Sequence, residues 1–152
     1  MGRNREKTRS NEALVLALLD SAAFVERRLD RALANTRGIS FSEFRMLRSL
    51  STFQDGTGMR VELADAVGLT PSAITRALKP LEKLGYVSTQ KSERDARRSL
   101  VTLSAAGFEL LADARTTIAD AISSLPLALL NDTRLSDFRN ELLGKAAGTK
   151  TA

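Results

Sequence analysis

Residues 60–104 decide the fold, and they read RVELADAVGLTPSAITRALKPLEKLGYVSTQKSERDARRSLVTLS. A short helical turn at their start stops at Gly68, and Thr70 and Pro71 suit the N-cap and first position of a second helix. Apolar residues then recur every three or four positions, which predicts one buried helix face, until Gly85 ends the helix. Two helices joined by a glycine-containing turn, the second with a polar and basic face, predict a helix-turn-helix.

Two short strands are expected after the second helix. Residues 86–90 and 99–103 alternate apolar and polar side chains and contain several β-branched residues. The intervening residues 91–98 are polar, with five charged residues among the last six. A hairpin with a charged tip that follows a helix-turn-helix is a wing, so the whole stretch predicts a winged helix-turn-helix.

The wing and its flanks resemble the MarR (multiple antibiotic resistance regulator) family. The predicted tip contains an Asp-x-Arg pair, Asp95 and Arg97, and a Leu-Ser-x-x-Gly sequence that ends at Gly107 follows it. These two elements recur together in the family. Residues 81–87 are similar to the family's exit from the recognition helix, and residues 80–107 are the specific part of the match.

This resemblance implies a mainly α-helical fold with a small β-hairpin wing, the winged helix-turn-helix being embedded between N- and C-terminal dimerisation helices. It implies a homodimeric, sequence-specific regulator of transcription that binds double-stranded DNA, and we expect a repressor on a pseudo-palindromic operator. A small, often aromatic, anionic ligand releases many family members from DNA, so such an effector is a candidate partner. A twofold dimer would set two recognition helices about one DNA turn, ~34 Å, apart.

The chain is expected to form a single domain over residues 11–147, preceded by a disordered basic tail over residues 1–10. Residues 40–104 would be the DNA-binding lobe, and residues 11–37 and 105–147 the dimerisation helices. The first of these helices has apolar stripes on two faces and therefore needs two partners. The candidate dimer interface is Leu14, Leu18, Val25, Ile122, Leu135, Phe138 and Leu142.

Local signals predict further elements. Ser40 and Glu43 have capping-box spacing for a helix that braces the helix-turn-helix. Residues 59–61 are expected to add an edge strand to the wing. Helices are expected over about 105–125, after a capping serine, and over about 133–145.

The candidate DNA-binding residues of the second helix are Thr70, Ser72, Thr75, Arg76 and Lys79. Arg76 can contact guanine with two hydrogen bonds, and a phosphate contact is the open alternative. The three hydroxyls suit phosphate oxygens at a helix N-terminus, with simple capping as the alternative.

The wing candidates are Arg94, Asp95, Arg97 and Arg98. The resemblance aligns Arg97 with the arginine that enters the minor groove, and Asp95 with the acid that orients it. Arg94 and Arg98 would contact phosphate, and a solvated turn is the alternative for the cluster.

Composition narrows the remaining classes. The chain has 152 residues, a net charge of +5, and neither cysteine nor histidine, so disulfides and thiol redox sensing are excluded and only oxygen ligands remain for a metal. We therefore expect no metal, no cofactor and no catalysis. No apolar run could form a signal peptide or a membrane span, which predicts a cytoplasmic protein.

Positive charge concentrates in two places that could meet phosphate. Residues 1–10 contain four basic and one acidic side chain, and residues 60–103 contain eight basic and five acidic ones. The alternatives left open are a winged helix used for protein–protein assembly and a non-specific architectural DNA-binding protein.

Overall fold

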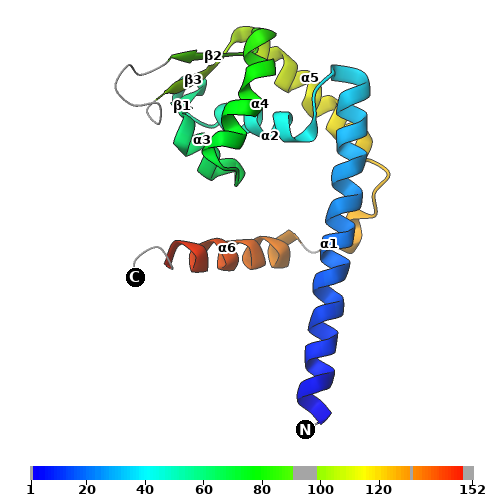
Figure 1. The fold of residues 1–152 in the computed structure, drawn as a ribbon. Helices are drawn as coiled ribbons and strands as arrows, with labels where there is room; N and C mark the ends of the chain where they lie inside the picture. The colour runs from blue at the N-terminus through cyan, green and yellow to red at the C-terminus, as the bar shows by residue number, and fades with distance from the viewer. Residues whose placement is uncertain (1, 91–98, 131, 149–152) are drawn as a thin grey trace. The chain divides into compact units, whose positions relative to one another are not determined.

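The computed structural model describes residues 2–90, 99–130 and 132–148, and it consists of two compact units. The first unit, Met1–Ile122, contains five helices labelled α1 to α5 and a small sheet. The second unit, Ser123–Ala152, contains the short 3-10 helix Leu127–Leu129 and helix α6, Asp132–Gly148 (Figure 1). The predicted fold class is confirmed, since helices dominate and the only sheet of the described residues is the small one beside the helix-turn-helix. That residues 11–147 act as a single domain stays a prediction.

Helix α1 runs from Gly2 to Arg37, so it begins nine residues before the predicted start at residue 11, and the disorder of residues 1–10 stays a prediction. Low hydrophobicity shows that a segment contributes little to a core, but it does not stop a helix that has already formed. The arginine, glutamate and lysine residues of this segment are good helix formers, and no proline interrupts them. The C-terminal end of α1 agrees with the prediction, since Gly38 has a left-handed φ of 68°.

Helix α2, Phe41–Leu50, has the predicted capping box. The backbone N–H of Glu43 donates to Ser40 Oγ over 3.1 Å, and the backbone N–H of Ser40 donates to Glu43 Oε2 over 2.7 Å. The helix buries four side chains against the helix-turn-helix, as expected: Phe44, Met46, Leu47 and Leu50.

The helix-turn-helix consists of α3, Arg60–Val67, and α4, Pro71–Lys83. Gly68 ends α3 with a φ of 71°, a left-handed conformation that favours glycine. Thr70 caps α4, because its Oγ1 accepts a hydrogen bond of 3.2 Å from the backbone N–H of Ala73. Both capping predictions are confirmed.

The sheet has three antiparallel strands in the order β1-β3-β2: β1, Thr57–Met59; β3, Leu100–Leu103; and β2, Val87–Gln90. Thr57 pairs with Thr102, and Thr89 pairs with Val101. The predicted edge strand exists but ends at Met59, two residues earlier than expected. Glu62 explains the shift, because its Oε2 accepts from the backbone N–H of Met59 over 2.8 Å and so starts α3 there.

Helix α5, Ala105–Ile122, packs against α1 and shares the core of the first unit. It ends three residues before the predicted end at Leu125. Arg37 and Asp113 form a salt bridge of 3.0 Å between α1 and α5, and Arg28 Nε donates to the carbonyl of Ala121 over 2.7 Å. These contacts fix the C-terminal half of α1 on the lobe.

Candidate nucleic-acid interface

Helix α4 turns one face into the core and leaves the opposite face open. Ile74, Leu78 and Leu81 are buried, which follows from their spacing of three and four residues. The exposed positions of the helix and its cap include four of the five predicted residues: Thr70, Ser72, Arg76 and Lys79. The open face therefore combines a hydroxyl-bearing N-terminus with two cationic side chains, the composition that a phosphate-rich groove requires.

Thr75, the fifth predicted residue, lies differently. Its side chain is half-buried, and its Oγ1 donates to the carbonyl of Pro71 over 2.9 Å. Arg60 Nη1 lies 3.4 Å from Oγ1 of Thr75. The hydroxyl proton of Thr75 is thus donated within α4 itself, and a DNA contact by this residue stays a prediction.

Arg60 is a residue of this region that the sequence did not single out. Its backbone N–H donates to the carbonyl of Ser99 over 2.9 Å, and its guanidinium reaches Thr75. Arg60 therefore joins the start of α3 to the end of the wing segment and to the recognition helix. No local sequence pattern marks such a contact between three distant segments.

The C-terminal end of α4 is held by a compact joint around Ser104. Its backbone N–H donates to the carbonyl of Tyr86 over 3.0 Å, and its Oγ lies 2.6 Å from the carbonyl of Gly85. The same Oγ accepts from the backbone N–H of Gly107 over 3.0 Å and so caps α5. The Leu-Ser-x-x-Gly sequence thereby connects the recognition helix, the wing and α5, and it fixes the angle at which α4 is presented.

Gly107 is buried at this joint for a steric reason. A Cβ atom at this position would overlap the carbonyl oxygen of Tyr86 and the side chain of Leu103. Only glycine lets the two backbones approach so closely. The sequence identified Gly107 as part of a motif, and the structure supplies its role.

Four predicted wing residues, Arg94, Asp95, Arg97 and Arg98, lie outside the described residues. The structure describes the strands on either side of them. Thr89 in β2 donates its backbone N–H to Glu82 Oε1 of α4 over 3.2 Å, so the base of the wing is tied to the recognition helix.

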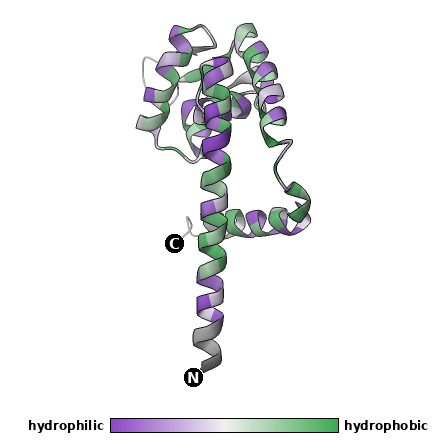
Figure 2. Cartoon of the chain, turned by 90° about the vertical axis from the view of Figure 1, so that its right-hand side faces the viewer, coloured by the Kyte–Doolittle hydropathy of each residue, from purple (hydrophilic) through white to green (hydrophobic). Residues whose placement is uncertain are grey.

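Five of the seven predicted dimer-interface residues are exposed within the described part of a single chain: Leu14, Leu18, Leu135, Phe138 and Leu142. Val25 and Ile122 are half-buried. Every side chain from residue 7 to residue 22 of α1 is exposed, and hydrophobic residues recur along this part of the helix (Figure 2). The side chain of Leu14 is 70% exposed, and it lies in a run of exposed leucines and valines. Such an apolar run on a surface typically marks an interaction site.

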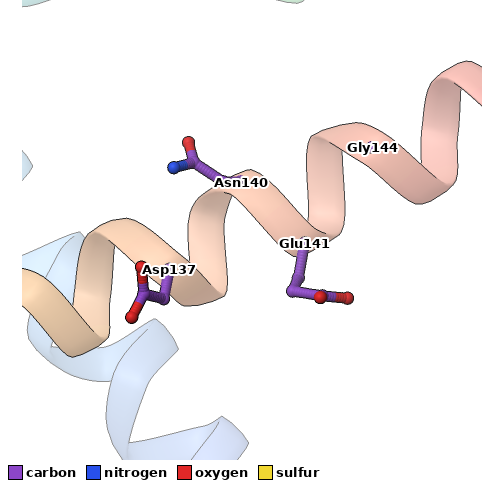
Figure 3. Close-up of a pocket in the computed structure, with 4 residues that line it drawn as sticks. All are labelled: Asp137, Asn140, Glu141 and Gly144. Carbon is purple, nitrogen blue, oxygen red and sulfur yellow. The ribbon is translucent and has the colours of Figure 1, made fainter.

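A hollow lies along α6, where Asp137, Asn140, Glu141 and Gly144 line it (Figure 3). All four come from a single helix, so the hollow is a helix face rather than an enclosed site. The described residues include no group of acidic side chains that could hold a metal ion. No helix among the described residues is long and apolar enough to cross a membrane.

Comparisons with known proteins agree with this geometry. The model of the MarR family matches residues 39–99, which confirms the resemblance seen in the wing. No curated protein matches the chain. A MarR family transcriptional regulator from Streptomyces coelicolor, solved in complex with DNA, is similar with a TM-score of 0.76 and 23% identity over 90% of this chain and 86% of that chain.

Two further solved structures are similar. The transcriptional regulator BldR from Sulfolobus solfataricus has a TM-score of 0.73 and 22% identity over 91% of this chain and 98% of that chain. CouR from Rhodococcus jostii, bound to p-coumaroyl-CoA, has a TM-score of 0.70 and 24% identity over 88% of this chain and 91% of that chain. At these identities the structures show a shared fold.

Proposed function

We propose that the chain is a homodimeric transcriptional repressor of the MarR family, whose model matches residues 39–99. It binds a pseudo-palindromic site in double-stranded DNA. The observation that carries this proposal is the open face of α4, which bears Ser72, Arg76 and Lys79 while the opposite face is buried. A neighbour of the same fold was solved in complex with DNA, which supports the proposal.

Dimerisation is the second part of the proposal. Residues 11–37 and 105–147 supply the dimerisation helices, and residues 40–104 form the DNA-binding lobe. The exposed apolar side chains of α1 and α6 support this division, because single soluble chains rarely leave so many large apolar residues on two helices uncovered. A second copy of the chain, related by a twofold axis, would cover them.

An effector is the third part. We propose that a small anionic aromatic molecule releases the protein from DNA. CouR was solved with p-coumaroyl-CoA, an anionic molecule with an aromatic acyl group. Fluorescence polarisation of a labelled operator duplex, titrated with a panel of aromatic carboxylates and their CoA esters, tests this part by the release of the duplex.

Arg76→Ala is expected to lower affinity for the specific site about tenfold or more, with a smaller loss on random duplexes. An arginine in the major groove that contacts a guanine contributes roughly 1–3 kcal/mol of discrimination. The measurement is fluorescence polarisation with both duplexes at one salt concentration. Lys83→Ala is the control, because Lys83 is exposed on the same helix about two turns further along. Equal losses on both duplexes in Arg76→Ala would make Arg76 a phosphate contact.

Arg97→Ala is expected to weaken binding to all duplexes and to flatten the plot of log K against log salt by about 1 per subunit. The Asp95-x-Arg97 spacing carries this expectation. Asp95→Ala should give a partial loss if the carboxylate orients Arg97, because the charge that meets DNA remains. Tighter binding by Asp95→Ala would show instead that the carboxylate merely repels phosphate.

A further inference from the structure

A second basic site is lined by residues outside α4. A surface hollow of about 230 Å³ is lined by the C-terminal half of α2, by Thr52 just after that helix, and by the C-terminal end of α3. These two helices pack against each other in the lobe (Figure 1). The residues that line the hollow are Arg45, Arg48, Ser49, Thr52, Ala66 and Val67. Neither arginine was assigned a role from the sequence.

The charge of this hollow is unbalanced. Arg45 and Arg48 are three positions apart on α2, so their side chains lie on the same helix face, and both are exposed. Neither forms a salt bridge with any carboxylate that the structure describes. Two like charges at this spacing repel each other weakly, and an anion bound between them would reverse the sign of that interaction. The position of Arg48 near the C-terminus of α2 favours a cation there, but this does not explain Arg45.

The donors in the hollow suit a tetrahedral oxyanion. Arg45 Nη2 donates to the carbonyl of Val67 over 3.4 Å, a long bond that leaves its other N–H groups free for a ligand. Arg48 adds a second planar guanidinium, the group that matches phosphate oxygens with paired hydrogen bonds. Thr52 is an acceptor here, since its hydroxyl proton is donated to the carbonyl of Ser49 over 2.7 Å. The two arginines are therefore the cationic groups that would recognise the ligand, with the hydroxyl of Ser49 beside them.

We propose that this hollow binds a phosphate group, held between Arg45 and Arg48. The group is either a backbone phosphate of DNA outside the groove that α4 reads, or the phosphate of a free small molecule. The hollow ends at Val67, where α3 stops before the turn into α4, so an occupied site adjoins the helix-turn-helix. A phosphate group carries no sequence information, so this site would not distinguish one DNA sequence from another. The two arginines would bind the phosphate in the same way in DNA and in a small molecule.

The test uses the full-length chain and the double variant Arg45→Gln/Arg48→Gln. Both side chains are exposed, so the fold should be retained, as a thermal melt can check. The control is Arg27→Gln/Arg31→Gln, which removes two exposed arginines one turn apart on α1. A third variant, Arg45→Lys/Arg48→Lys, keeps the charge but removes the paired geometry and should bind phosphate more weakly than the wild type.

Two measurements separate the sources. Inorganic pyrophosphate, titrated into the protein without DNA and followed by NMR at the amides of residues 45–52 and 66–67, should bind at least ~10-fold more weakly to the glutamine variant than to the wild type. In parallel, the slope of log K against log salt for binding to a random duplex is measured for the wild type and for the glutamine variant. A slope reduced by about 1 or more per subunit assigns the phosphate to DNA. A lost pyrophosphate site with an unchanged slope assigns it to a small molecule.

Two results would overturn the proposal. One is a glutamine variant that matches the wild type in both measurements. The other is an equal loss in the α1 control, because the effect would then come from net charge alone. Neither result bears on the role of α4, which is judged by the ratio of specific to random affinity in the wild type.

Discussion

Leu18→Asp is expected to convert the dimer into monomers and to lower operator affinity by at least about 100-fold. Leu18 is 42% exposed in the single chain and lies one helical turn from Leu14 on α1, so the core of the lobe does not depend on it. A carboxylate placed in an apolar interface loses its hydration without gaining a partner. A dimer binds two half-sites with two linked lobes, which raises its affinity by a factor of roughly 10²–10⁴, and a monomer loses this gain.

Sedimentation equilibrium gives the mass, and circular dichroism checks that the lobe remains helical. The control is Ala13→Asp, which adds the same charge to α1 five positions earlier, about 140° around the helix from Leu18. A dimer that survives Leu18→Asp would contradict the division of the chain into dimerisation helices and a DNA-binding lobe.

Gly107→Ala is expected to lower the free energy of unfolding by about 3 kcal/mol, and so to lower the melting temperature by roughly 6–12 °C. The added methyl group meets the backbone carbonyl of Tyr86, which cannot rotate away as a flexible side chain can. The joint around Ser104 must then open, and α4 loses its fixed angle. Operator affinity should therefore fall even at temperatures where the protein stays folded.

Gly144→Ala is the matched control for this substitution. Gly144 lies inside α6, and apart from its chain neighbours and the backbone of its own helix no atom of the described residues lies within 4 Å of the position that its Cβ would occupy. Alanine has the higher helix propensity, so the melting temperature should stay the same or rise slightly. If Gly107→Ala had the same melting temperature as the wild type, the close approach of α5 to Tyr86 would not be present in solution.

The local signals of the sequence were sufficient for most helix boundaries of the lobe. A cap involves residues within four positions of each other, so Ser40 with Glu43 and Thr70 with Pro71 could be identified before any tertiary contact was known. The same holds for Gly68, whose left-handed conformation ends α3. The polar face of α4 followed from the periodicity of its buried residues.

Contacts between distant segments could not be predicted in this way. The contact of Arg60 with Thr75 and the hollow beside Arg45 and Arg48 depend on how α2, α3 and α4 pack. Thr75 looked equivalent to Ser72 in the sequence, yet its side chain is half-buried and its hydroxyl donates to the carbonyl of Pro71. The start of α1 was misplaced for a different reason, since the sequence marks no N-cap before Gly2 and composition alone suggested disorder.

Selection of binding sites from a random duplex library tests sequence-specific recognition by a dimer most directly. The proposed function predicts enrichment of an inverted repeat whose half-site centres lie about 10 base pairs apart, one turn of DNA. Arg76→Ala should relax the preference within each half-site and leave the spacing unchanged. A library that shows no enrichment, or that enriches single half-sites without a fixed spacing, would contradict the account.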